Sequence, residues 1–226
     1  RWVKRTFERA DPSRPTIAHS GVVAHLPQLD GTDSHLWFGW RSGEARDLID
    51  RARRLPRSVR FVSEFGADSV PTTAPFVDEQ LRRRRWPDLD WDELAERFGY
   101  QRELMESLFP PSDFESFEEW RDVTQLYQSH VLKVQIETLR RLKYRPTGGF
   151  CFSSLADPSP NISSSVLDHS RTAKDAYETV FEACRPVIVV ADLPPDWVNP
   201  GATLELDLHL VNDLRTPIGD AKVEAT

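Results

Sequence analysis

The chain has 226 residues, of which 39% are hydrophobic and 29% are charged, and its formal net charge is -7. This length is enough for one well-packed core, or for one domain and part of another. The acidic balance and a pI near 5.4 argue against a nucleic-acid partner. The basic run at 82–85 is surrounded by acidic residues, so we interpret it as a solvated helix face.

No apolar stretch reaches the roughly 18 residues needed to cross a bilayer, so no membrane partner is expected. Cys151 and Cys184 have no metal-ligand spacing, and we interpret them as reduced residues that pack in the interior. No residue cluster has the spacing of a metal site and no glycine-rich loop fits a phosphate, so neither a metal nor a cofactor is expected. The chain begins at Arg1, which leaves export undecided; the cytoplasm is the favoured compartment.

Strands and helices are predicted to alternate along residues 1–185. A helix that carries Trp2, Val3 and Phe7 on one face ends before the proline at 12. Short apolar runs predict strands at 16–20, 35–40, 59–62 and 150–155. Apolar residues spaced three and four apart predict helices at 44–55, 118–143 and 172–184. This order is typical of parallel strands joined by right-handed crossovers.

A long insertion, residues 67–116, follows the strand at 59–62. It is expected to hold a basic helix and a second helix capped by Asp90. After Pro186 the pattern changes: 187–190 predicts a strand, 199–201 a tight turn, 204–210 a half-buried antiparallel strand, and 221–225 the start of another. This pattern suggests the start of an immunoglobulin-like domain.

Neither part is a complete domain. Four parallel strands cannot close a barrel of eight, and three strands rarely make a stable sandwich. We therefore predict an α/β fold in which residues 1–185 are the C-terminal half of a (β/α)8 TIM barrel. Residues 186–226 are predicted to be strands of an incomplete immunoglobulin-like sandwich. The missing N-terminal half of the barrel is then an expected partner.

Glu64 is the main candidate for chemistry. It follows the strand at 59–62, and the C-terminal edge of parallel strands is where α/β folds place their active sites. From this pattern alone, a structural or solvated role is the commoner interpretation of a single Glu at a strand end.

The segment Ser63-Glu64-Phe65-Gly66 resembles the nucleophile motif of glycoside hydrolase family 2, which includes β-galactosidases, β-glucuronidases, β-mannosidases and exo-glucosaminidases. Residues 33–37 resemble the Asp-x-His-x-Trp segment of the β-mannosidase and exo-glucosaminidase branch, and 56–61 loosely match its Pro-Arg-Phe lead-in. Downstream, 148–160, 163–168 and 174–177 follow the frame of the family's last barrel strand, Ser-Trp-x-x-x-Asp segment and Lys-x-x-x-Tyr helix. The resemblance covers most of the chain.

Several residues depart from this family pattern. Phe152 stands where the family has tryptophan, Ser153 and Ala156 replace a glutamine and an asparagine, and Ser159 and Ser164 replace tryptophans. Aromatic faces and amides stack on sugars and hydrogen-bond to them, so their loss implies a different or a weakened substrate pocket.

The resemblance implies that Glu64 is the nucleophile of a retaining exo-β-glycosidase that is similar to β-mannosidases. Such enzymes need a second carboxyl about 5 to 5.5 Å away to protonate the leaving group. In the family this acid/base is a Glu that follows an Asn, but Asn161, Asn199 and Asn212 are followed by Ile, Pro and Asp. The acid/base is thus absent from this chain, and we expect the 226 residues alone to hydrolyse nothing.

Further residues are predicted to contact the carbohydrate substrate: His35, Trp37, Trp40, Phe152 and Asp157. Trp37 can stack on a sugar and His35 can donate to a hydroxyl, with a packed aromatic cluster as the equal alternative. Asp157 either binds a hydroxyl or caps the following turn. His19 and Asp168 are interpreted as structural.

Two classes of function stay open. The first is a glycoside hydrolase that acts on a β-linked mannoside, glucosaminide or galactoside. The second is a non-catalytic, degenerate relative that keeps the scaffold for carbohydrate binding or for architecture, and the lost tryptophans and amides make this a credible alternative. An Asn-Glu pair in the residues upstream would support the first class.

Overall fold

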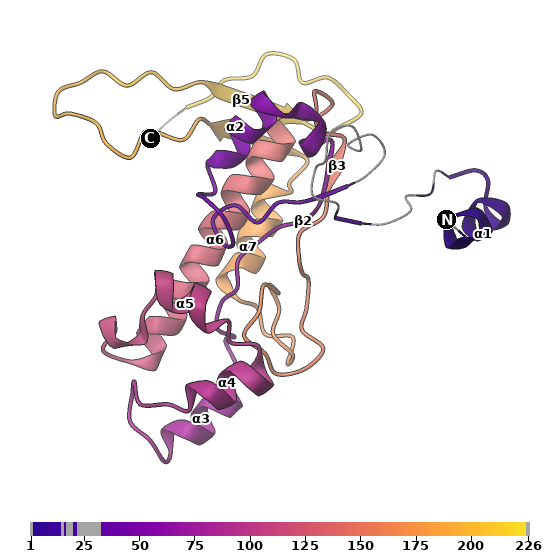
Figure 1. Cartoon of the computed structure of the whole chain (residues 1–226). Coiled ribbons are helices and arrows are strands. Elements are labelled where there is room, and N and C mark those ends of the chain that lie inside the picture. The colour runs from indigo at the N-terminus through magenta and orange to yellow at the C-terminus, as the bar shows by residue number, and fades with distance from the viewer. Residues whose placement is uncertain (1, 15, 17–19, 22–32, 225–226) are drawn as a thin grey trace.

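The computed structural model describes residues 2–14, 16, 20–21 and 33–224, which form a mixed helix and strand structure (Figure 1). The helices are α1 (Trp2–Ala10), α2 (Asp47–Arg54), α3 (Pro75–Leu81), α4 (Trp91–Phe98), α5 (Arg102–Leu108), α6 (Phe117–Arg141) and α7 (Asp175–Ala183). The strands are β1 (Ser34–His35), β2 (Phe61–Glu64), β3 (Gly149–Phe150), β4 (Val187–Ala191) and β5 (Leu208–Asn212). Within the described residues, no helix combines the length and apolar character that crossing a membrane requires.

Three parallel strands form the sheet that positions the candidate site, in the order β1-β2-β3. In the register of β1 with β2, His35 lies opposite Glu64. The ladder continues past the strand ends, because the backbone N–H of Leu36 donates to the Glu64 carbonyl at 2.9 Å and that of Ser153 donates to the Phe65 carbonyl at 3.0 Å. The predicted parallel arrangement is confirmed for these three strands.

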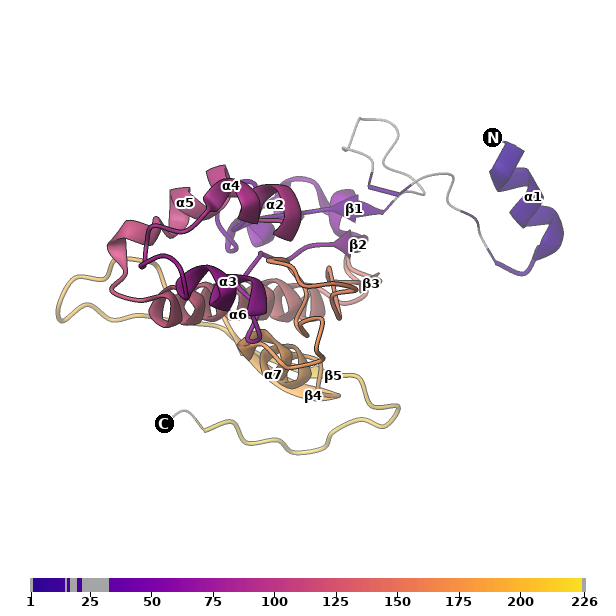
Figure 2. The same ribbon diagram turned by 90° about the horizontal axis from the view of Figure 1, so that it is seen from below.

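The long helix α6 is the central support of the structure, with α2 across one end and α7 alongside it (Figures 1 and 2). Ser116 caps its N-terminus by accepting a hydrogen bond from the backbone N–H of Glu119 at 3.2 Å. The predicted apolar stripe is buried in two clusters. One joins α6 to β2, α2 and α7 and includes Val62, Phe65 and Ile136.

The second cluster packs the insertion against α6 and is centred on Trp120 of that helix. Its aromatic rings lie close together, with Trp86 and Trp91 at 5.5 and 5.6 Å from the Trp120 ring centroid. Asp90 caps α4 as predicted, because its side chain accepts from the backbone N–H of Glu93.

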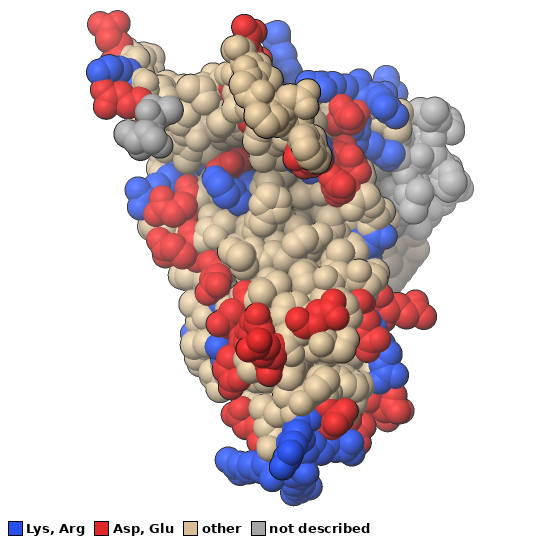
Figure 3. All heavy atoms as spheres, turned by 90° about the vertical axis from the view of Figure 1, so that its left-hand side faces the viewer, with Lys and Arg blue, Asp and Glu red and all other residues tan. Residues whose placement is uncertain are grey.

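The predicted basic helix in the insertion is wrong. The helix α3 ends at Leu81, and Arg82–Arg85 follow it in a turn. Arg83 is paired with Glu79 at 3.0 Å and Arg84 with Asp90 at 2.9 Å. Figure 3 shows basic side chains gathered at the lower tip of the molecule, where Figure 1 places α3 and α4. This basic tip is therefore partly neutralised by local ion pairs.

Several predicted strands are shorter than expected. The strand predicted at 35–40 ends after His35, because the Trp37 carbonyl accepts hydrogen bonds from the N–H groups of Arg41 and Trp40 in a turn. The strand predicted at 59–62 begins later, at Phe61, because residues 56–59 form a 3₁₀ helix that starts with Pro56. The strand predicted at 16–20 falls largely outside the described residues, as does His19.

The C-terminal residues form a two-stranded antiparallel pair, β4 with β5, in which Val189 lies opposite Leu210. The predicted turn at 199–201 is present, since the N–H of Ala202 donates to the Asn199 carbonyl at 3.0 Å. No strand forms over the described part of the one predicted at 221–225. Apolar side chains stay exposed along this segment, with Trp197 at 80%.

Both cysteines are free thiols, but Cys151 and Cys184 are exposed, so the prediction that they pack in the interior is wrong. Cys151 lies between Phe150 and Phe152, which pack against the core cluster. Because neighbouring residues of an extended segment point to opposite sides, Cys151 faces outward. Cys184 follows the last residue of α7, beyond the buried Ala183.

We expect Gly66→Ala to destabilise the protein. Gly66 has φ +144°, and an added Cβ would lie 2.9 Å from the Ser153 carbonyl oxygen. Backbone strain of this kind costs about 1–3 kcal/mol. Urea denaturation should show this loss, whereas Gly148→Ala, whose added Cβ meets its nearest neighbour at 3.4 Å, should be neutral or slightly stabilising. Equal stability of the two variants would contradict the strain argument.

Candidate functional site

Glu64 ends the central strand of the sheet, and its side chain is 38% exposed. Its Oε2 atom accepts a hydrogen bond from Trp37 Nε1 at 3.3 Å and lies 3.1 Å from His35 Nδ1. Among the described residues, Oε1 has no hydrogen-bond partner. Oε2 is thus held by one hydrogen bond from Trp37 and lies next to the His35 ring, whereas Oε1 is unpartnered within the part of the chain that the structure describes.

On the side away from Glu64, His35 lies next to two polar side chains, those of Ser20 and Asp33. Its Nε2 atom lies 3.1 Å from Ser20 Oγ and 4.0 Å from Asp33 Oδ2. Asp33 also accepts a hydrogen bond from the hydroxyl of Ser63, the residue before Glu64. The motif at 33–37 already contained Asp33 and His35, but it gave no sign of the contacts with Ser20 and Ser63.

Trp37 and Trp40 have different environments. The Trp37 indole is half-buried, and the Arg41 guanidinium lies 5.1 Å from its ring centroid. Trp40 is only 4% exposed and belongs to the core cluster between the insertion and α6. Its buried Nε1 has no hydrogen-bond partner among the described residues. Trp37 therefore lies beside Glu64. Trp40 is instead a packed core residue, which was the alternative to a role in substrate binding.

Phe152 and Asp157 follow β3. Phe152 is half-buried and packs against the cluster that contains Phe65. Asp157 is 3% exposed, and both its carboxylate oxygens accept from the Ser163 hydroxyl at 2.8 Å. No hydrogen bond of Asp157 reaches Glu64 within the described residues. Between Phe152 and Asp157, the peptide bond Ser153–Ser154 is cis.

A buried lysine joins the loop that follows β2 to the loop that follows β3. Lys174 is 1% exposed, and its Nζ donates to the carbonyl oxygens of Ser69 at 3.0 Å and Ser163 at 2.9 Å. Burial lowers the pKa of Lys174 to about 8, although the carboxylates of Asp157 and Asp68 raise it in part. In the sequence, Lys174 stands out only as the first residue of the segment 174–177, which resembles the Lys-x-x-x-Tyr helix of the family.

Asp168 is buried in the same region and organises the chain before α7. Its carboxylate accepts from the backbone N–H groups of Ser170, Thr172 and Thr73, each at 2.9 Å. Three hydrogen bonds to backbone donors are what a loop-stabilising carboxylate makes. These contacts agree with the structural role interpreted from the sequence.

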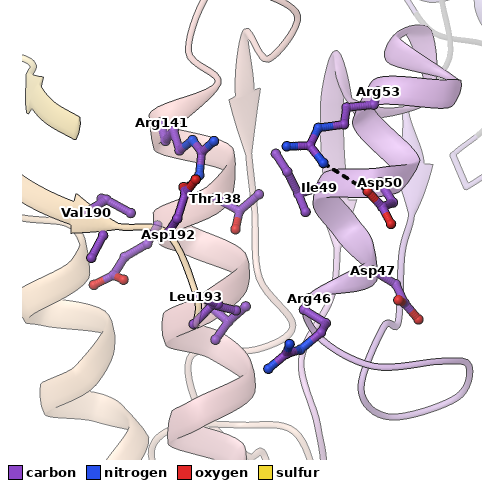
Figure 4. Close-up of a pocket in the computed structure, with 13 residues that line it drawn as sticks. Arg46, Asp47, Ile49, Asp50, Arg53, Thr138, Arg141, Val190, Asp192 and Leu193 are labelled. Atoms are coloured by element: carbon purple, nitrogen blue, oxygen red, sulfur yellow. Dashed lines mark hydrogen bonds and ion pairs between the residues drawn. The ribbon is translucent and has the colours of Figure 1, made fainter. Parts of the chain in front are cut away.

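A cavity of about 240 Å³ lies elsewhere, between α2, α6 and the end of β4 (Figure 4). Charged side chains that line it are paired with each other: Arg53 forms an ion pair with Asp50 at 3.2 Å, and Arg141 forms one with Asp192. None of the predicted site residues lines this cavity. We therefore centre the candidate site on Glu64.

Asp192 also contributes to a group of three side chains whose ligand atoms lie within 4.8 Å of one another, together with Asp207 and His209. The Arg141 guanidinium already binds the Asp192 carboxylate, and His209 Nε2 lies 3.4 Å from it. A cationic arginine on a ligand oxygen opposes a metal ion at the same place. We interpret the group as an ion-pair cluster.

Comparison with known proteins gives a match among solved structures only. No family model matches the chain, and no curated protein matches it. The β-D-mannosidase from Dictyoglomus thermophilum matches with a TM-score of 0.63 at 23% identity, over 91% of this chain and 24% of that chain. The structure described here therefore has the fold of one segment of a glycoside hydrolase. The enzyme that matches at this TM-score is a β-D-mannosidase.

Two further matches have TM-scores too low to support an argument. They are a β-glucuronidase from Bacteroides uniformis, at 0.48 and 18% identity over 84% of this chain and 20% of that chain, and a GH2 β-galacturonidase from Eisenbergiella tayi, at 0.45 and 14% identity over 80% of this chain and 28% of that chain. The chain spans less than a third of the length of each of these enzymes. The resemblance to glycoside hydrolases that the motifs indicated is confirmed at the level of the fold.

We expect Lys174→Met to lower the free energy of unfolding by about 3 kcal/mol, because removing one partner from a buried charged group leaves the others unpaired. Chemical denaturation measures the loss. The matched control is Lys133→Met on α6, whose side chain is 57% exposed and which should change stability by less than about 0.5 kcal/mol. Equal effects in both variants would contradict a bridging role for Lys174.

We expect the stability of the protein to fall as the pH rises from about 4 to about 6, in part because of Asp68. Burial raises the pKa of Asp68 to about 6 from its ordinary value of 3.8, against the opposing effect of Lys174. Across this window the folded state binds more protons than the unfolded state, so protonation stabilises the fold and is lost as the pH rises.

Asp68→Asn removes this titration and should flatten the dependence of the unfolding free energy on pH within that window. Asp88→Asn, at an exposed position, is the control and should leave the dependence unchanged. Measurements of urea unfolding at several pH values test this. A steeper or unaltered dependence in Asp68→Asn would refute the assignment.

Proposed function

We propose that this chain belongs to glycoside hydrolase family 2 and forms part of a retaining exo-β-glycosidase that is similar to β-mannosidases. The observation that carries the proposal is the setting of Glu64. It ends the central strand of a parallel sheet, with Oε2 bound by Trp37 Nε1 and next to His35 Nδ1, and with Oε1 unpartnered among the described residues. A nucleophilic carboxylate requires this combination of fixed orientation and one accessible oxygen.

We further propose that residues 1–185 are the C-terminal part of a TIM barrel and that residues 186–226 begin an immunoglobulin-like sandwich. The sequential parallel order β1-β2-β3 supports the first assignment, and the antiparallel pair β4–β5 supports the second. The exposed apolar side chains of the C-terminal segment, which include Trp197 and Leu208, also favour a sandwich whose other strands lie outside this chain.

In the proposed reaction Glu64 Oε1 attacks the anomeric carbon, and the bond from that carbon to the leaving oxygen breaks. A carboxyl group on residues outside this chain gives its proton to the leaving oxygen. Water then attacks the anomeric carbon of the glycosyl ester and gives its proton to the same carboxylate, which frees Glu64. The indole N–H of Trp37, which donates to Oε2, stabilises the Glu64 carboxylate when it is released.

For substrate contacts, we assign Trp37 and His35 to the pocket wall next to Glu64. Phe152, half-buried after β3, is proposed to offer an aromatic edge where the family has a tryptophan. Trp40 and Asp157 are buried, and we propose that they support the pocket from behind. The small residues that follow Phe152 favour a pocket that differs in shape from that of the family.

We expect Glu64→Gln to lower the hydrolysis rate of the full-length protein on the order of 10³-fold or more, because an amide cannot act as the nucleophile. The assay uses 4-nitrophenyl β-mannoside, β-glucosaminide and β-galactoside. Glu96→Gln, at an exposed position on α4, is the control and should keep full activity. The 226-residue chain without the upstream residues should be inactive.

Two outcomes would contradict the proposal. Equal activity of Glu64→Gln and the unchanged protein would remove Glu64 from the mechanism. A full-length protein that binds these sugars but hydrolyses none of them would favour the non-catalytic alternative. Ser159 and Ser164, which stand where the family has tryptophans, are the reason to test this alternative.

A further inference from the structure

The pairing of β1 with β2 is irregular next to Glu64. Ser34 of β1 lies opposite Val62 of β2. The next residue, His35, lies opposite Glu64, so one step along β1 corresponds to two steps along β2. Ser63 is the extra residue and has no opposite residue on β1, which defines a β-bulge. Bulges change the direction of a side chain, and they are common next to active sites.

The bulge decides which side chain faces His35. In a regular ladder both strands advance together, and Ser63 would then lie opposite His35. With the bulge, Glu64 takes this place, and its Oε2 atom lies 3.1 Å from His35 Nδ1 and accepts from Trp37 Nε1 at 3.3 Å. A slip of one residue along a strand turns its side chains to the other face. The position of the Glu64 carboxylate therefore depends on the bulge.

We propose that Asp33 is a positioning residue that holds this bulge and thereby aims Glu64, an inference that rests on the proposed role of Glu64 as nucleophile. Asp33 directly precedes β1 and is 5% exposed. Its Oδ2 atom accepts a hydrogen bond from the hydroxyl of Ser63, the bulged residue. This contact joins the two strands at the place where their register is interrupted.

A third segment of the chain fixes Asp33 in turn. The Ser20 hydroxyl donates to Oδ2 at 2.5 Å, and the backbone N–H of Gly21 donates to Oδ1 at 3.2 Å. Three donors around one carboxylate suit its ionised form, which only accepts hydrogen bonds. Although burial raises it, the hydroxyls of Ser20 and Ser63 hold the pKa of Asp33 below its ordinary value. The carboxylate thus binds the bulge from a fixed place.

The hydrogen bond from Ser63 to Asp33 acts on Glu64 through the backbone. Ser63 and Glu64 are joined by one peptide bond, so a bulge that is free to shift takes the Glu64 carboxylate with it. The attack on an anomeric carbon needs a close and aligned approach, and a small displacement of the nucleophile slows it. Such a displacement lowers the rate of the chemical step more than the affinity for the sugar.

The experiment measures covalent trapping of Glu64 in the full-length protein. The probe is the 2-deoxy-2-fluoro β-glycosyl fluoride of the sugar that is hydrolysed fastest, and peptide mass spectrometry locates the label. In Ser63→Ala the maximal trapping rate should fall by about 10-fold to about 100-fold, the larger value being typical of a displacement near about 1 Å. The probe concentration that gives half of this rate should change by less than about 2-fold. Ser63→Thr keeps the hydroxyl and should restore the rate.

The matched control is Ser58→Ala. Ser58 directly precedes the segment that forms β2, is 1% exposed, and donates its hydroxyl to the Leu55 carbonyl at 2.7 Å. Removal of this hydroxyl should lower the midpoint of urea unfolding but leave the trapping rate unchanged. A general loss of stability therefore does not imitate the effect expected for Ser63→Ala.

Asp33→Ala tests the other end of the hydrogen bond. Because Asp33 and Ser63 act as one unit, the double variant should trap the probe no more slowly than Asp33→Ala alone. The variants at Ser63 and Ser58 decide the role of the bulge even if Asp33→Ala does not fold.

Three results would overturn the inference while leaving the proposed function in place. They are an unchanged trapping rate in Ser63→Ala, an equal loss of rate in Ser58→Ala or in Ser63→Thr, and fully additive effects of Asp33→Ala and Ser63→Ala. Absence of labelling at Glu64 in the unchanged protein would overturn the proposed function, and this inference with it.

Discussion

The site depends on the parallel hydrogen-bond ladder that runs through β2. Because the Glu64 carbonyl accepts from Leu36 and the following Phe65 carbonyl accepts from Ser153, the backbone around Glu64 is fixed from both sides. This restraint sets where the carboxylate emerges from the sheet. The same register places His35 opposite Glu64, which makes the 3.1 Å contact between their side chains a direct result of strand pairing.

Sequence patterns predicted the features that local chemistry determines. The helices α2, α6 and α7 lie within a few residues of their expected ends, and the Asp90 cap is present, because spacing and capping depend on nearby residues. The strand ends were less predictable. The strand β1 ends at His35 because the chain turns back on the Trp37 carbonyl, and no local sequence signal marks this turn. The exposed cysteines show the same limit, because apolar neighbours do not reveal which face of an extended segment is buried.

For the candidate site, sequence reasoning selected Glu64, His35 and Trp37, and the structure brings these three side chains together. It did not find the contacts of Asp33 with Ser63 and Ser20. Those contacts join residues up to 30 positions apart, and serine is too common to give a signal in one sequence. Hydroxyl networks of this kind follow from tertiary geometry alone.

The bridge made by Lys174 restrains the loops that follow β2 and β3. One ammonium group binds the carbonyls of Ser69 and Ser163, so the loops after β2 and β3 cannot separate without exposing a buried cation to new surroundings. One buried ammonium group therefore ties the two loops to each other, and a movement of either loop has to carry the other with it or break this bridge.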